Sequence, residues 1–176
     1  NATVLVHIGK CGGRSLLEGI GHAQRFADVY PVHIQKPIFR RDLTYIIIAR
    51  NPISRLLSAF NWRYRLVVEE GSQKDRFKGE HAVLSKYGSL NALAEALYDQ
   101  DGVPNATAQR EIRMIHHIRE DIAFYLSDLL EKCQPDQVVA VLMQERLDDD
   151  IARVFGYRNE IRQHTNPAGK EASELS

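Results

Sequence analysis

Short apolar runs alternate along the chain with segments of helical periodicity. Three continuous apolar runs, at residues 3–8, 43–49 and 137–143, predict strands buried on both faces of a sheet. A weaker strand is predicted within residues 27–34. Helical spacing predicts helices over 15–24, from Pro52 onward, over 81–99 with an interruption at Gly88, over 105–132 as one continuous or one broken stretch, and over 148–155. This alternation predicts one α/β domain with a mainly parallel central sheet flanked by helices.

Length and composition agree with a globular domain. The chain has 176 residues, of which 44% are hydrophobic and 26% are charged. We expect the domain over residues 1–162 and a polar loop or tail over 163–176. No apolar run approaches the roughly 20 residues of a membrane helix, so no transmembrane segment is expected.

The formal net charge is zero, which argues against a protein that coats nucleic acid. The charges are distributed unevenly along the chain, because residues 1–66 contain ten Lys/Arg and only three Asp/Glu. A basic segment with glycine turns favours an anionic small molecule as ligand. Chance clustering of charge on a solvated face explains the same pattern equally well.

Cysteines and histidines give no metal-binding pattern. The two cysteines, Cys11 and Cys133, form neither a metal spacing nor a disulfide framework, and a reduced compartment is the simpler interpretation. His116 and His117 are adjacent on a predicted helix and should point apart as half-exposed residues. No metal is therefore predicted.

A glycine-rich turn follows the first predicted strand. It runs from Gly9 to Gly13, carries Lys10, and leads into the predicted helix at Ser15. Glycines let main-chain N–H groups approach an anion, and the start of a helix adds a positive dipole end. The turn differs from a Walker A loop, in which the lysine follows the last glycine. It predicts an anion site without an ATP or GTP assignment.

The strand at 43–49 is followed by a second candidate site. Arg50 stands at the strand end, and Ser58 follows about two helical turns into the next element. The two side chains could hold one phosphate from two sides. Spacing alone gives equal weight to Arg50 capping surface carbonyls and Ser58 being a small packing residue.

Together the two sites resemble sulfotransferases that use 3′-phosphoadenosine 5′-phosphosulfate (PAPS), and most of all the carbohydrate (heparan/chondroitin-type) branch. The segments are HIGKCGGRSL at 7–16 and IIIARNPISRLLSAF at 46–60, against family motifs like HIPKTGGTSL and RDPxxRxxSxF. Residues 138–156 and 164–166 are similar to later family segments, though more loosely. The resemblance implies a P-loop-like nucleotide-binding fold and transfer of a sulfuryl group from PAPS to a hydroxyl, with no metal required.

The resemblance also implies residue roles. Lys10 would contact the bridging or 5′-phosphate oxygens and stabilise the leaving group, while Arg50 and Ser58 would bind the 3′-phosphate. The phosphosulfate cradle would consist of Gly12, Gly13, Arg14 and Ser15. His33, which lies between the two motifs, is the candidate general base because imidazole titrates near neutral pH.

The chain departs from the family pattern inside the first motif. Gly9 replaces a proline, Cys11 a threonine and Arg14 a hydroxyl residue, which removes one expected phosphate donor. Two alternatives therefore stay open, namely a P-loop-like nucleotide-dependent kinase and a noncatalytic nucleotide-binding module. The acceptor is expected to be a carbohydrate, and the compartment the cytoplasm if the protein is bacterial, or the Golgi lumen if it is a trimmed eukaryotic domain. The oligomeric state is left open.

Overall fold

A computed structural model describes residues 2–14, 16–17 and 29–156 of the chain. These residues form two compact units. The first contains the described residues up to Asn51 and from Asp121 onward, and the second contains residues 52–120. The predicted domain boundary at residue 162 lies outside the described residues and stays a prediction.

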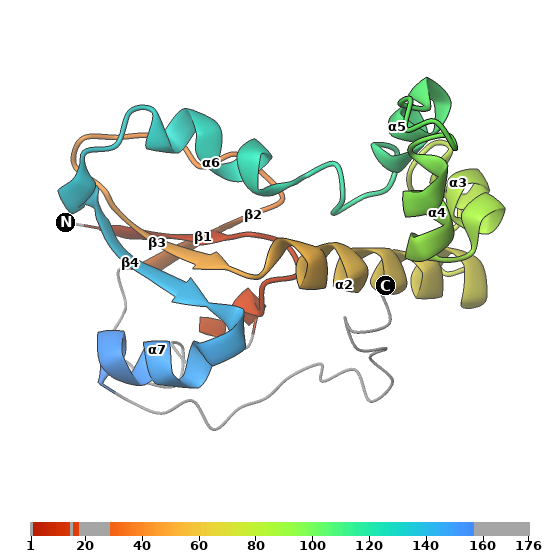
Figure 1. Ribbon diagram of the computed structural model, residues 1–176. Helices are drawn as coiled ribbons and strands as arrows, with labels where there is room; N and C mark the ends of the chain where they lie inside the picture. Colours follow the sequence, from red (N-terminus) through yellow and green to blue (C-terminus); the bar gives the residue numbers. More distant parts are fainter. Residues whose placement is uncertain (1, 15, 18–28, 157–176) are drawn as a thin grey trace. The chain divides into compact units, whose positions relative to one another are not determined.

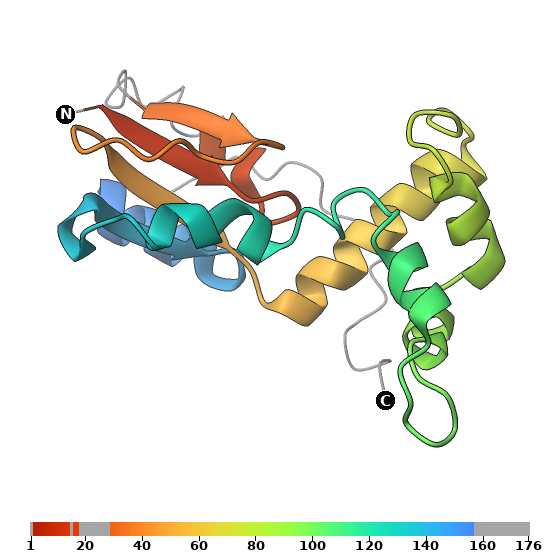
Figure 2. The same cartoon turned by 90° about the horizontal axis from the view of Figure 1, so that it is seen from above.

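A four-stranded sheet forms the centre of the first unit (Figures 1 and 2). Its strands are β1 (Thr3–His7), β2 (Val29–His33), β3 (Thr44–Ala49) and β4 (Val138–Met143). They lie in the order β2-β1-β3-β4, and every pairing is parallel. The α/β class and the parallel sheet predicted from the apolar runs are therefore confirmed.

The register of the strands brings their carboxyl ends to one edge of the sheet. His7 pairs with His33 on one side and with Ile48 on the other, and Ile48 pairs with Leu142. Whatever follows these strands must therefore gather at this carboxyl edge, which is where open α/β sheets bind ligands.

Helices α6 (Ile122–Leu130) and α7 (Leu147–Phe155) cover opposite faces of the sheet (Figure 1). Short 3₁₀ turns, at Pro135–Gln137 and Gln144–Arg146, stand before and after β4. Both helices contribute to one core with the strands, through Tyr125 and Leu129 of α6 and Ile151 and Phe155 of α7. Residues 45–48 of β3 are all buried, as expected for a strand covered on both faces.

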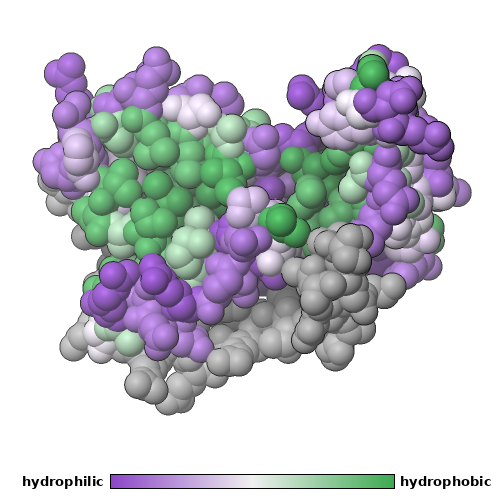
Figure 3. Space-filling view, viewed as in Figure 1, coloured by the Kyte–Doolittle hydropathy of each residue, from purple (hydrophilic) through white to green (hydrophobic). Residues whose placement is uncertain are grey.

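Strand β4 is an edge strand of the sheet formed by the described residues. Val139 is 52% exposed and Val141 44% exposed, whereas Leu142 is buried. Figure 3 shows apolar surface on the visible face of this unit, in the region of α6 and β4. The period-two pattern of β4 thus differs from the fully buried strand that its sequence predicts.

The second unit is helical. Its elements are α2 (Pro52–Tyr64), the π-helical turn Arg65–Glu69, α3 (Glu80–Tyr87), α4 (Leu90–Ala96) and α5 (Ala106–Ile112). Its core includes Phe60, Leu84, Leu93 and Ile115. Gly88 ends α3 with φ +69°, and Ser89 caps α4 by accepting from the Ala92 N–H group. The predicted interruption at Gly88 is therefore confirmed.

The predicted helix over 105–132 is broken in the structure. Helix α5 ends at Ile112 and α6 begins at Ile122, so residues 113–121 form an irregular segment. His117 has a left-handed backbone, with φ +67°, which a continuous α-helix does not allow. The sequence left room for a break in this stretch, and the structure places the break at residues 113–121.

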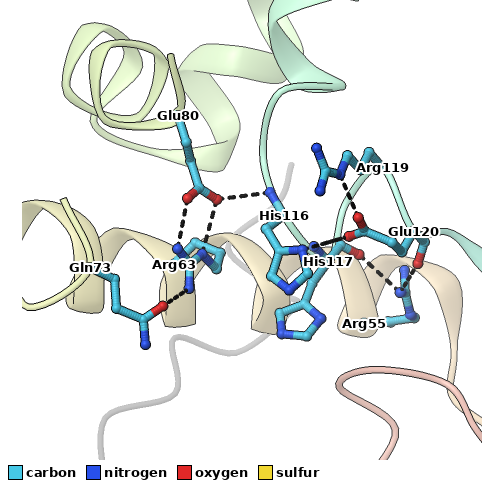
Figure 4. A network of polar contacts seen from close by, with 8 residues as sticks. All are labelled: Arg55, Arg63, Gln73, Glu80, His116, His117, Arg119 and Glu120. Carbon is cyan, nitrogen blue, oxygen red and sulfur yellow. Dashed lines mark hydrogen bonds and ion pairs between the residues drawn. The ribbon is translucent and has the colours of Figure 1, made fainter. Parts of the chain in front are cut away.

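A buried ion pair in the second unit explains part of the break (Figure 4). Arg63 donates to Glu80 through two hydrogen bonds, Nε to Oε1 at 2.9 Å and Nη2 to Oε2 at 2.7 Å. Both side chains are at most 2% exposed. Glu80 Oε1 also accepts from the main-chain N–H of His116 at 2.8 Å, and Arg63 Nη1 donates to Gln73 at 2.6 Å. The irregular segment is thus bonded to α2 and α3 through side chains.

Glu120 organises the rest of this polar network. It accepts from the His117 N–H at 2.7 Å and from Arg119, and it lies 2.9 Å from His116 Nδ1. Arg55 of α2 donates to the carbonyl oxygens of His117 at 2.9 Å and Glu120 at 2.5 Å. Burial alone would raise the pKa of Glu120, but hydrogen bonds from His116, Arg119 and the His117 N–H lower the pKa to about 2.

The prediction for the two adjacent histidines is wrong. His116 and His117 are both buried, and their rings contact each other with centroids 4.2 Å apart. The prediction assumed helical geometry, and the left-handed backbone at His117 removes that geometry.

Candidate anion site at the carboxyl edge of the sheet

The loop after β1 turns sharply back towards the sheet. Lys10 and Gly12 both have a left-handed backbone, with φ +70° and +81°, and residues 13–14 and 16–17 are helical. The Gly12 carbonyl accepts from the Leu16 N–H at 3.4 Å, so the helical turn begins directly after Gly12. Backbones that alternate between right- and left-handed residues point successive N–H groups into a concave nest that suits an anion.

Two glycines in this loop are required by their surroundings. A Cβ atom on Gly12 would lie 3.1 Å from Gln144 Cγ, in addition to the strain of its positive φ. A Cβ atom on Gly13 would lie 2.5 Å from the Cγ and Nε2 atoms of His7, and closer still to Cδ2. The loop is therefore packed between the residue that ends β1 and the residues that follow β4.

Arg50 connects the end of β3 to the same loop. Its Nη1 atom donates to the Lys10 carbonyl at 3.3 Å. Its Nε atom is buried and has no hydrogen-bond partner among the described residues. A buried guanidinium N–H without an acceptor costs free energy. Arg50 is therefore a fitting donor for an anion held beside the loop.

His33 ends β2 and lies against His7. The two imidazole rings stack with centroids 4.1 Å apart, and His33 Nδ1 lies 2.9 Å from the His7 carbonyl oxygen. A carbonyl oxygen only accepts, so the hydrogen bond assigns the proton to Nδ1. In neutral His33 the lone pair then lies on Nε2, so this tautomer could accept a proton only through Nε2.

His7 is the neutral member of this pair. Burial, followed by the charge of His33, lowers the pKa of His7 from 6.5 to about 4. The sequence predicted a packed His7, and the half-buried ring in contact with Gly13 and His33 agrees with that interpretation.

Residues after β4 complete this edge. Glu145 Oε1 accepts from the Asn51 N–H at 2.8 Å and joins the ends of β3 and β4. Asp150 is buried and accepts from the Met143 N–H at 2.7 Å and from Arg153 Nη2 at 3.0 Å. Asp150 was not among the residues expected from the sequence, although its spacing to Arg146 and Arg153 is typical of helical ion pairs.

The structure thus brings most of the predicted site residues of the first unit to one edge. The loop residues Lys10, Gly12 and Gly13 lie beside Arg50 and the His7–His33 pair. Arg14 is exposed at the start of the helical turn, and Ser15 lies outside the described residues. Ser58 is half-buried on α2 in the second unit, so its joint role with Arg50 stays a prediction.

No helix among the described residues is both long and apolar enough to cross a membrane. In the same part of the chain, His, Cys, Asp and Glu side chains do not gather in groups of three or more that could hold a metal ion. Comparisons with known proteins returned no matching family model, no matching curated protein and no matching solved structure.

Proposed function

We propose that this protein is a PAPS-dependent sulfotransferase that acts on a hydroxyl group of a carbohydrate. One observation carries the proposal. A glycine loop suited to an anion and a histidine whose Nδ1–H donates to a main-chain oxygen lie at the same edge of a parallel sheet. The motif resemblance supplies the identity of the donor, and the geometry supplies groups suited to the two tasks of the reaction.

The first task is to hold the phosphates of the donor. N–H groups in the first turn of a helix have no partner within that helix, and the positive φ of Gly12 shapes the loop before it. Arg50 is fixed to the loop through Nη1 and has an unsatisfied buried Nε. These donors suit a phosphate better than a neutral ligand because the guanidinium group of Arg50 carries a positive charge beside the loop.

The second task is to take a proton from the acceptor. The His33 lone pair on Nε2 receives the hydroxyl proton while the acceptor oxygen forms a bond to sulfur. The bond between sulfur and the phosphate oxygen breaks, and its electron pair leaves with 3′,5′-bisphosphoadenosine. The proton ends on His33, where the His7 carbonyl continues to accept from Nδ1–H. Positioning and electrostatic stabilisation then account for the acceleration, as in phosphoryl transfer.

Lys10 has the role of stabilising charge on the leaving phosphate. Its left-handed backbone is uncommon for a residue with a side chain and costs about 1 kcal/mol or more. Backbone strain at a residue is often kept where function needs its side chain. The positive φ of Lys10 is consistent with such a role in the loop.

Binding of 3′,5′-bisphosphoadenosine tests the donor assignment. The proposal expects this compound to bind and to raise the unfolding temperature, while ATP with Mg²⁺ does not. Arg50→Ala should weaken binding by at least about tenfold, which corresponds to the loss of a charge-assisted hydrogen bond. Arg41→Ala is the matched control, because Arg41 is an exposed arginine that precedes β3 rather than following it.

Transfer of radiolabelled sulfate from PAPS to a panel of oligosaccharides tests the reaction itself. Stabilisation by ATP with Mg²⁺ alone would support the kinase alternative. Binding of the bisphosphate without transfer to any acceptor would support the noncatalytic module. Loss of binding in Arg50→Ala but not in Arg41→Ala, together with transfer, would support the sulfotransferase.

A further inference from the structure

His7 lies between the two parts of the candidate site. Its ring occupies the space that a side chain on residue 13 would need, because a Cβ atom there would lie 2.5 Å from His7 Cγ and Nε2. Gly13 is not among the residues with positive φ, so its backbone conformation is open to any residue. The reason for glycine at this position is therefore the His7 ring.

The same residue holds His33. Its ring stacks on the His33 ring at 4.1 Å between centroids, and its carbonyl oxygen lies 2.9 Å from His33 Nδ1. The two histidines are also register partners of the parallel strands β1 and β2. His7 thus contacts the loop with one part of its ring and the proposed base with another.

We propose that His7 is a positioning residue that fixes the distance between the anion loop and the base His33. This proposal rests on the proposed function, since it assigns His33 the proton-transfer step. If the ring were absent, the loop could settle towards β1 and His33 would lose its stacking partner, so the base and the donor would no longer be held at a fixed separation. A misplacement of reacting groups by about 1 Å costs about 100-fold in rate.

The His7 ring also suits this place electrostatically. Burial and the neighbouring His33 lower the pKa of His7 to about 4, so its ring stays neutral at neutral pH. A neutral imidazole ring does not repel the positive charge that His33 gains when it accepts a proton. His7 can therefore support the base without competing for the proton.

Steric coupling between residues 7 and 13 gives a direct test. Gly13→Ala should weaken binding of 3′,5′-bisphosphoadenosine by at least about tenfold and lower the unfolding temperature, because the new methyl group meets the ring. His7→Ala removes the ring, so the double variant His7→Ala/Gly13→Ala should regain both binding and unfolding temperature to the level of His7→Ala. Turnover of His7→Ala and of the double variant should stay about 100-fold below that of the wild type.

Gly12→Ala is the matched control. Its methyl group would meet Gln144 rather than His7, and its positive φ is strained in any case. His7→Ala should therefore not rescue Gly12→Ala. His7→Phe should keep turnover within about tenfold of the wild type, because an aromatic plate of similar size remains against His33.

Defined results would overturn the proposal. One is a double variant that binds as poorly as Gly13→Ala, and another is His7→Ala with wild-type turnover. If Gly13→Ala does not fold, the turnover of His7→Ala is compared with that of His7→Phe. Equal turnover in these two variants would contradict the positioning role of His7. A different result would separate the two proposals. If the wild type does not bind the bisphosphate, but the double variant regains its unfolding temperature, His7 does pack on Gly13. The proposed function would then be refuted, and the positioning role with it.

Discussion

The Nδ1 atom of His33 lies 2.9 Å from the main-chain oxygen of His7, at the carboxyl ends of two paired strands. This contact fixes the tautomer of His33, because the carbonyl oxygen only accepts. The backbone of β1 therefore orients the proposed base, and the same strand leads directly into the glycine loop.

His33→Gln should lower kcat by about 100-fold or more, since general base catalysis contributes at least that much. Glutamine can still donate to the His7 carbonyl, so the affinity for 3′,5′-bisphosphoadenosine should change little. Steady-state kinetics with PAPS and calorimetry with the bisphosphate measure the two effects separately. Equal losses in binding and turnover would assign His33 to donor binding instead of proton transfer.

Lys10→Gly should abolish most turnover without lowering stability. Glycine adopts φ +70° without the steric cost that lysine carries, so the unfolding temperature should stay the same or rise. Lys10→Ala removes the same charge but keeps the strained backbone. Thermal unfolding and turnover of both variants check this expectation. Wild-type activity in either variant would exclude the leaving-group role of Lys10.

Glu80→Gln should destabilise the second unit strongly. It removes the charge that is paired with Arg63, whose side chain is 2% exposed, and leaves that cation buried without a carboxylate. Breaking a buried pair in this way costs about 3–5 kcal/mol. Asp42→Asn is the control, because the Arg40–Asp42 pair is exposed and its loss should have little effect. Urea denaturation of both variants provides the comparison.

The low pKa of His7 predicts a pH dependence of stability. His7 titrates near 6.5 when unfolded and near 4 when folded, so between these values the unfolded chain binds more protons. Stability should therefore fall as the pH decreases from 6.5 towards 4, by up to about 3 kcal/mol from this group. His7→Phe should lose less stability over the same interval. Parallel stability curves for the two proteins would contradict the shifted pKa.

The sequence predicted the sheet well because three of the four strands in the described residues are continuous apolar runs. The predicted strand at 43–49 begins one residue before β3 and ends at the same residue. Gly88 ends α3 at the position where the sequence predicted an interruption. The predicted loop at Gly9–Gly13 and the position of Arg50 at a strand end also agree with the structure.

Contacts between residues far apart in the chain could not be predicted in the same way. The stack of His7 on His33 depends on the register of β1 against β2, which no local pattern encodes. The break at His117 depends on Glu80 and Glu120, whose carboxylates accept main-chain N–H groups of the irregular segment. Apolar spacing identifies the buried residues of a segment but not the polar side chains that interrupt its helix.

If the protein is a sulfotransferase, the loop at residues 9–13 holds a phosphate of the sulfate donor. A crystal structure of the protein with 3′,5′-bisphosphoadenosine tests it most directly. We expect the 5′-phosphate at the main-chain N–H groups of Gly12 and Gly13, with Arg50 donating to a phosphate of the same nucleotide. A nucleotide bound elsewhere on the protein, or a loop left without phosphate at saturating concentration, would contradict it.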